Sequence, residues 1–352
     1  MPDPILKLFA PIPKDWDPDY PIHTASSQSC FQRCEMQHHL RYEMGFVGIG
    51  PYPNLEIGSA THKGLEGYWN GLSYIQAMVH VNEYMNKEDY FSTDAGKIDK
   101  IKVATYVKGY FGRWGNDRDL YDVIGVELQF FSPTGEHGRA ALAGKLDVLV
   151  RRKSDGQLII IEHKTAGTGT GADDPGSFYW EKLSMDNQLC FYVDQVFKLT
   201  GEMPEVIYDV VLKTRAKPNK GKATRRKGES DAALQARKDK NAETLSQFAT
   251  RLDQTYQYER NKRYIRKPIP ILDTELSLKR EELEGIRDKI ESLLYRRNRN
   301  TSACMSFGSV CEYKDVCLGI HSGDKSALLE NNLKLKSKKQ AHEELEKEKE
   351  TQ

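Results

Sequence analysis

The 352-residue sequence has no run of about 18 apolar residues, so no segment is expected to span a membrane. It has almost no net charge, because 52 Lys and Arg stand against 51 Asp and Glu. A uniformly basic coat and an acidic tail are therefore excluded, whereas local charged patches are not. The sequence also lacks a GxxxxGK[ST] phosphate loop, which excludes a P-loop motor within this chain. The first residues lack the features of a secretion signal, and we expect a cytoplasmic protein.

Cysteine is scarce, with six residues, and in a reducing cytoplasm close Cys spacing favours metal binding over disulfides. Apolar residues make up 38% of the chain and charged residues 29%, with a mean hydropathy of −0.66. These values indicate a soluble protein with a genuine core and polar appendages.

Hydrophobic periodicity divides the chain into helical, strand-rich and irregular parts. We expect an extended arm (1–22), a helical part (23–118), a core sheet with a crossover helix (119–212), a basic insertion (213–240), C-terminal helices with a cysteine-bearing turn (241–319) and a charged, disordered tail (320–352). Helices are expected over 26–42, 58–85, 100–118, 180–199, 241–258 and 273–297, and strands over 123–131, 139–152, 157–165 and 205–212. This order predicts one α/β domain with a small mixed sheet flanked by helices.

The strongest chemical signal lies in residues 144–166, GKLDVLVRRKSDGQLIIIEHKTA. Asp155-Gly156 between two apolar runs predicts a two-residue hairpin turn, which places Asp147 directly opposite Lys164 with Glu162 on the same face. Two converging carboxylates repel each other unless they are paired or share a cation such as Mg²⁺ or Mn²⁺. Such an ion can polarise a phosphoryl oxygen and activate water, which suits phosphodiester hydrolysis. The alternative is a structural salt bridge of either carboxylate with Lys164.

Asp147 followed by Glu162-His163-Lys164 resembles the D…(D/E)xK signature of the PD-(D/E)xK nuclease superfamily. Two flanking motifs resemble its RecB-like branch, which includes phage-encoded and CRISPR-associated exonucleases. Gly58-Ser59-Ala60-Thr61-His62 matches GxxxH, and Gln188-Leu189-Cys190-Phe191-Tyr192 matches QxxxY. The resemblance covers about residues 26–317 and implies a restriction-endonuclease-like core with helical segments at both ends.

The resemblance also implies roles for individual residues. The metal ligands would be His62, Asp147, Glu162 and the main-chain carbonyl of His163, and the catalytic lysine would be Lys164. Gln188 and Tyr192, one helical turn apart, would contact DNA or brace the site. A hydrogen-bonded helix histidine is the alternative for His62, and a helix edge packed on the sheet is the alternative for Gln188 and Tyr192. Glu127 is a further candidate for positioning the site.

Cys304, Cys311 and Cys317 lie in one short segment and need a fourth ligand to close a metal site. Cys34 resembles the N-terminal cysteine that, in iron–sulfur members of the branch, joins three C-terminal cysteines around a [4Fe–4S] cluster. Structural Zn²⁺ is the alternative, and Cys30 could replace Cys34. Such a cluster would join the two helical ends of the chain. Cys190 is expected to be an ordinary buried residue.

Two basic segments are candidates for nucleic-acid contacts. Residues 213–240 carry eleven Lys and Arg against three Asp and Glu, which fits either a solvated insertion or a loop that follows phosphates. Residues 256–267 alternate basic side chains with tyrosines, which fits either stacking on single strands or a helix end packed on a core.

Together these features predict a metal-dependent DNA nuclease, an exonuclease acting on DNA ends or single strands in recombination, repair or phage or CRISPR DNA processing. A structure-specific endonuclease of the same fold and a non-catalytic DNA-binding or assembly protein are the alternatives. Because the chain has no motor motif, a helicase, recombinase or CRISPR adaptation protein is expected as a separate partner.

Overall fold

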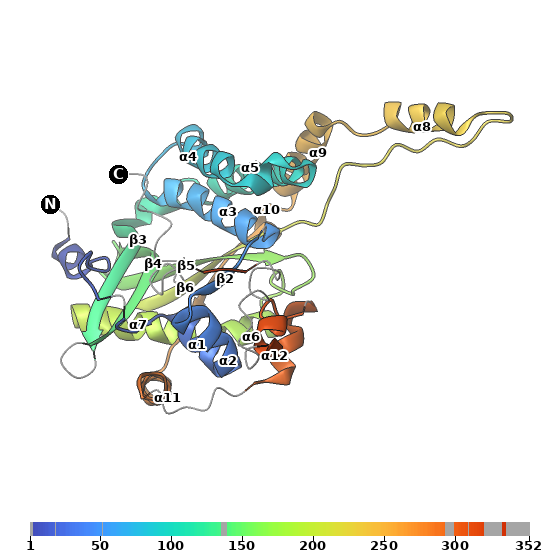
Figure 1. Ribbon diagram of the computed structural model, residues 1–352. Coiled ribbons are helices and arrows are strands. Elements are labelled where there is room, and N and C mark those ends of the chain that lie inside the picture. Colours follow the sequence, from blue (N-terminus) through green and yellow to red (C-terminus); the bar gives the residue numbers. More distant parts are fainter. Residues whose placement is uncertain are drawn as a thin grey trace.

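The computed structural model describes residues 3–17, 19–50, 52–134, 139–292, 299–308, 310–319 and 333–335. A six-stranded mixed sheet lies between two layers of helices (Figure 1). This confirms the predicted α/β class and the mixed central sheet flanked by helices. Within the described ranges, no helix is both long and apolar enough to cross a bilayer.

The central sheet has the order β1-β4-β5-β6-β7, with β3 also paired to β4. Its strands are β1 (Ile22–His23), β3 (Tyr121–Thr134), β4 (Ala140–Arg152), β5 (Leu158–Gly167), β6 (Glu205–Lys213) and β7 (Tyr264–Ile269). Strands β3, β4 and β5 form an antiparallel meander, β5 and β6 are parallel, and β7 is antiparallel to β6. A separate ribbon pairs β2 (Phe46–Gly48) with β8 (Leu333–Leu335).

The helices cover both faces of the sheet (Figure 1). On one face lie α3 (Pro53–Trp69), α4 (Tyr74–Lys87), α5 (Asp94–Trp114) and α9 (Leu245–Tyr258). On the other face lie α7 (Asn187–Thr200) and, packed on it, α11 (Asp273–Glu291). The shorter helices are α1 (Ala25–Arg33), α2 (Glu35–His38), α6 (Phe178–Ser184), α8 (Asp231–Lys240), α10 (Arg260–Arg263) and α12 (Lys314–Gly319). Because both faces are covered, β4 and β5 are almost entirely buried, which explains their continuous apolar runs.

The β4–β5 hairpin differs in register from the predicted one. Val148 pairs with Ile161, so the register continues to Asp147 beside Glu162 rather than beside Lys164. The loop contains four residues instead of two, since Arg152 N–H donates to the Gln157 carbonyl at 2.9 Å. The prediction was therefore wrong by two residues. Because a shift of two preserves the alternation of a strand, each side chain keeps its predicted face.

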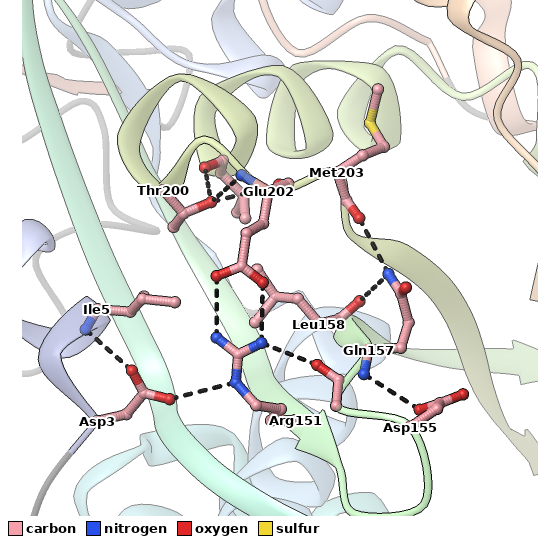
Figure 2. A network of polar contacts seen from close by, with 11 residues as sticks. Asp3, Ile5, Arg151, Asp155, Gln157, Leu158, Thr200, Glu202 and Met203 are labelled. Atoms are coloured by element: carbon pink, nitrogen blue, oxygen red, sulfur yellow. Dashed lines mark hydrogen bonds and ion pairs between the residues drawn. The ribbon is translucent and has the colours of Figure 1, made fainter.

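A polar network holds the hairpin end of the sheet together (Figure 2). The Arg151 guanidinium donates to both carboxylate oxygens of Glu202 at 2.8 and 3.1 Å and to the Gly156 carbonyl at 2.8 Å. It also lies 3.4 Å from a carboxylate oxygen of Asp3. One side chain thus ties the N-terminal segment and the α7–β6 loop to β4.

Further segments differ from the sequence expectations. The expected extended arm 1–22 contains a short 3-10 helix, Pro4–Leu8, and the helices expected over 58–85 and 180–199 are divided into α3 and α4 and into α6 and α7. The insertion 213–240 contains the ten-residue helix α8 rather than irregular chain alone. Strand β7 was not predicted, because Pro268 and three basic or aromatic residues obscure its alternation. The tail 320–352 lies outside the described residues except for β8, and those three residues form a strand.

Candidate active site and metal centre

Asp147 on β4 and Glu162 on β5 lie where the two strands separate. The β4–β5 ladder ends at Val148 and Ile161, one residue short of both carboxylates. The Asp147 carboxylate instead accepts a hydrogen bond from the main-chain N–H of His163 at 2.7 Å. This bond fixes the backbone between the two acidic side chains and keeps them at one end of the hairpin.

Lys164 and Gln188 close around the Glu162 carboxylate. Lys164 Nζ donates to Glu162 Oε1 at 2.9 Å and to Gln188 Oε1 at 2.8 Å. Gln188 Nε2 donates to the same Glu162 oxygen at 2.9 Å and to the Tyr192 hydroxyl at 3.0 Å. Asp186 caps α7 by accepting from Gln188 N–H at 3.0 Å, and this fixes where the helix begins. The structure therefore places Gln188 against Glu162 and Lys164 and Tyr192 against Gln188, and their role in contacting DNA or bracing the site stays a prediction.

His62 approaches from α3 in the opposite helical layer. Its Nδ1 lies 3.7 Å from Asp147 Oδ1, and its side chain is 30% exposed. Glu66, on the same helix, pairs with Lys63 at 2.8 Å. Position 64 is glycine, and a Cβ there would lie 2.2 Å from the Val107 side chain of α5, so α3 packs closely there. The His62 side chain therefore faces the Asp147 carboxylate and does not contact residues of α3 alone.

Glu127 on β3 completes a group of three ligand-bearing residues. His62, Glu127 and Asp147 each offer an atom, and these atoms lie within 4.8 Å of one another. Glu127 also forms an ion pair with Lys145. Its φ of +53° is a left-handed conformation that costs a non-glycine residue about 1–3 kcal/mol. No sequence pattern signals this conformation, because a register shift between Val123 and Gly125 decides which residue faces Asp147.

The donor atoms fit a hard divalent cation. Carboxylate oxygens and an imidazole nitrogen suit Mn²⁺, and carboxylates suit Mg²⁺. Glu162 Oε2 is buried and has no hydrogen-bond partner within the described part of the chain, so a cation nearby would satisfy it. The role of the His163 main-chain carbonyl as a ligand stays a prediction.

Burial and neighbouring charges shift the pKa values of Asp147 and Glu162 in opposite directions. Burial raises the pKa of Glu162 to about 7, with Lys164 opposing and the charge of Asp147 adding to the shift. Burial also acts to raise the pKa of Asp147, but the contact with His62 outweighs it and holds that pKa below its usual range. The pKa of Lys164 is raised despite burial, because the charges of Glu162 and Asp186 favour the ammonium. At neutral pH the site thus holds an ionised Asp147 and a charged Lys164.

Residues 23–318, most of the chain, match the family model of the PD-(D/E)XK nuclease superfamily. The chain belongs to the PD-(D/E)XK nuclease superfamily. Members are typically nucleases that use divalent metals, so membership supports metal-dependent nuclease activity. None of the curated proteins matches the chain.

The residues that match the PD-(D/E)XK signature line a cleft of about 500 Å³ between α3, α7 and the hairpin. Four basic side chains line the same cleft, namely Arg41, Lys63, Lys145 and Lys164. Cations around an acidic site favour a phosphate-bearing substrate, because they offset the repulsion between phosphates and carboxylates.

A buried ionic network lies behind strand β5. Asp209 on β6 is fully buried, and its Oδ2 accepts from Arg266 Nε at 3.0 Å and from the Tyr110 hydroxyl at 2.5 Å. The same oxygen lies 3.4 Å from Nδ1 of His163. Arg266 also stacks over Trp114, with 4.0 Å between the guanidinium carbon and the ring centroid. This network joins β5, β6, β7 and α5 directly behind the site.

Four of the six cysteines gather near one apolar cluster. Cys34, Cys311 and Cys317 pack against the cluster formed by Met36, Leu40, Phe46, Tyr313, Val316 and Leu333. The Cys304 carbonyl accepts a hydrogen bond from Cys311 N–H at 2.8 Å. All six cysteines are free thiols, and in the described ranges no three thiols come within 4.8 Å of one another. The structure therefore gathers these side chains without showing a cluster.

The second basic segment, residues 256–267, is partly buried in the core and partly exposed. Tyr256 and Tyr264 are only 1% exposed and belong to the core beneath α5, whereas Tyr258 is 93% exposed. Arg266 is buried in the network behind the site. Tyr256 and Tyr264 are therefore too buried to stack on the bases of a single strand.

Proposed function

We propose that this member of the superfamily is a Mg²⁺- or Mn²⁺-dependent deoxyribonuclease that acts as an exonuclease on DNA ends or single strands. The observation that carries the proposal is the convergence of His62, Glu127 and Asp147 within 4.8 Å of one another, beside the Glu162–Lys164 pair. The ordered set of motifs that resembles RecB-like exonucleases supports the end-dependent mode.

Each residue has a distinct task in this reaction. The two carboxylates, His62 and Glu127 would hold the divalent ion, which when bound polarises the scissile phosphate and lowers the pKa of water. Lys164 would orient the attacking water and stabilise charge that develops on the phosphate. Gln188 forms hydrogen bonds with both Lys164 and Glu162, so the Lys164 ammonium is shared between Gln188 and Glu162 rather than bound by Glu162 alone.

Replacement of Lys164 by Ala tests the catalytic assignment. We expect hydrolysis of labelled DNA in Mg²⁺ or Mn²⁺ to fall by at least a factor of about 10², as for loss of a general acid–base group. DNA binding should survive. Lys63→Ala is the matched control, because this lysine lines the same cleft but pairs with Glu66. Cleavage by Lys164→Ala at the rate of the unmodified protein would remove the assignment.

The form of the DNA substrate distinguishes the alternatives. An exonuclease degrades end-labelled linear DNA and leaves a covalently closed circle intact. Cleavage of the circle would instead identify an endonuclease of the same fold. Binding to both substrates with no hydrolysis in either metal would identify a non-catalytic DNA-binding protein.

We further propose that Cys34, Cys304, Cys311 and Cys317 hold a [4Fe–4S] cluster. Four thiolates suit either this cluster or structural Zn²⁺. The likeness of Cys34 and the three C-terminal cysteines to those of iron–sulfur members of the RecB-like branch supports the cluster. Anaerobic preparation should therefore yield iron and sulfide, whereas one zinc and no iron would support the zinc alternative.

We also propose that the protein acts in recombination, repair or phage or CRISPR DNA processing. Because the chain has no phosphate loop of its own, we expect it to work with a separate helicase, recombinase or CRISPR adaptation protein. Association measured with and without the [4Fe–4S] cluster would test whether such a partner uses the helical ends of the chain.

A further inference from the structure

A long arm, residues 214–243, leaves the sheet at the end of β6 and returns at α9 (Figure 1). None of its residues is buried. Its base is held at two points. Asn219 N–H donates to Glu243 Oε2 at 2.7 Å, and Arg251 of α9 binds the same carboxylate at 2.7 and 2.8 Å. The arm therefore projects from a fixed base rather than from a loose loop.

The arm carries a surplus of unpaired positive charge. Of its four acidic side chains, Glu229, Asp231 and Glu243 form ion pairs with Arg237, Arg225 and Arg251, and Asp239 accepts a hydrogen bond from Gln235. Eight further basic residues make no ion pair with any residue in the described ranges: Arg215, Lys217, Lys220, Lys222, Arg226, Lys227, Lys238 and Lys240. The arm contains no Phe, Tyr or Trp.

The base of the arm lies at the rim of the catalytic cleft. Lys164 pairs with Val210 in the parallel β5–β6 ladder, and β6 ends at Lys213, about 10 Å further along the sheet. Lys213 Nζ lies 3.5 Å from the main-chain carbonyl of Asn54, and Asn54 lines the cleft. The arm therefore begins at one edge of the cleft.

We propose that the arm binds the phosphate backbone of duplex DNA next to the cleft, an inference that rests on the proposed deoxyribonuclease function. Proteins that hold single strands combine cations with aromatic stacking platforms, and the arm has only the cations. Duplex DNA offers one negative charge per about 1.7 Å of axis, which suits contacts through charge alone. The outward leg, residues 214–226, can extend about 40 Å, close to one turn of the duplex.

The test is a variant that neutralises four of the arm's cations that form no ion pair within the described ranges: Lys220→Gln, Lys222→Gln, Arg226→Gln and Lys227→Gln together. Binding is measured by fluorescence anisotropy in Ca²⁺, with a labelled duplex and with one of its strands alone. We expect duplex affinity to fall at least tenfold, and the slope of log K against log salt to decrease by about 0.9 for each phosphate that the arm no longer neutralises. Single-strand affinity should change less than threefold. In Mg²⁺, KM for duplex DNA should rise while kcat is kept.

A matched control removes four exposed lysines elsewhere: Lys87→Gln, Lys97→Gln, Lys153→Gln and Lys198→Gln. It should bind both DNAs like the unmodified protein. Equal losses for duplex and single strand in the arm variant would overturn the assignment to duplex DNA. No loss in a protein that cleaves DNA would overturn the role of the arm and leave the deoxyribonuclease proposal intact. Arm-dependent duplex binding by a protein that never hydrolyses DNA would support the role of the arm and overturn the deoxyribonuclease proposal.

Discussion

Glu162 is a buried carboxyl with only one of its two oxygens hydrogen-bonded within the described residues. It is 3% exposed, Oε1 receives two hydrogen bonds, and Oε2 receives none from the described residues. A buried carboxylate in this state is expensive unless it is protonated or bound to a cation. The sequence placed this carboxyl among isoleucines, but only the structure shows which of its oxygens lacks a partner.

The pH dependence of stability should show this directly. The pKa of Glu162 rises from 4.5 to about 7 on folding, so the folded protein binds more protons than the unfolded one in that window. The contribution of this group to the free energy of unfolding therefore falls as pH rises from 4.5 to 7, by at most about 3 kcal/mol. In EDTA, Glu162→Gln should gain stability relative to the unmodified protein as pH rises from 5 to 8. Urea unfolding at several pH values measures this, and a pH-independent difference would contradict it.

Glu127 gives a second test at the residue scale. If its strained backbone is kept because its carboxylate holds a metal, Glu127→Gln should weaken Mn²⁺ binding by about tenfold or more, as losses at metal sites do. Calorimetric titration measures the affinity. Glu66→Gln is the control, because this carboxylate lines the cleft but pairs with Lys63. Equal Mn²⁺ affinity in both variants would make Glu127 only a partner of Lys145.

At the scale of elements, the hairpin shows what a sequence pattern can predict. The alternation of Asp147, Glu162 and Lys164 with apolar residues predicts their shared face, and an error of two in register leaves that face unchanged. The loop length could not be predicted, because Asp155-Gly156 occurs both in two-residue turns and, as here, at the end of a four-residue loop. The convergence of α3, α7 and β3 on the hairpin depends on tertiary packing that no local pattern contains.

A buried ion pair, Arg266 with Asp209, joins strand β7 to strand β6. Arg266 is the cation nearest to the fully buried Asp209, and Arg266→Met would leave that carboxylate without a charged partner. Loss of one member of such a pair costs about 3–5 kcal/mol. We expect this loss in urea unfolding. The double variant Asp209→Asn with Arg266→Met should recover part of it, because the fully buried charge is then absent and Asp117, the other ion-pair partner of Arg266, is 28% exposed. A single variant within about 1 kcal/mol of the unmodified protein would show that Tyr110 and the surrounding rings suffice.

At the scale of the whole molecule, an early segment of the chain meets two late ones. The β2–β8 ribbon and the apolar cluster that includes Phe46 and Leu333 join residues 34–48 to residues 311–317 and 333–335. The spacing of the three C-terminal cysteines predicted such a junction only through a metal. The structure adds an apolar basis for it, since Tyr313 donates from its hydroxyl to the Phe46 carbonyl at 2.9 Å.

The proposed cluster would close a loop of about 270 residues around the catalytic sheet, and links across loops this long stabilise proteins by roughly 4–5 kcal/mol. Cys34→Ser should therefore lose iron, lower the melting temperature and speed hydrogen exchange in α1, α2 and α12, while exchange in β4–β6 changes little. Cys30→Ser is the control, because Cys30 is buried one helical turn away and outside the apolar cluster that Cys34 contacts. If Cys34→Ser retained iron and Cys30→Ser lost it, Cys30 rather than Cys34 would be the fourth ligand of the cluster. Iron absent from every form would leave the junction to the apolar cluster and the β2–β8 ribbon alone.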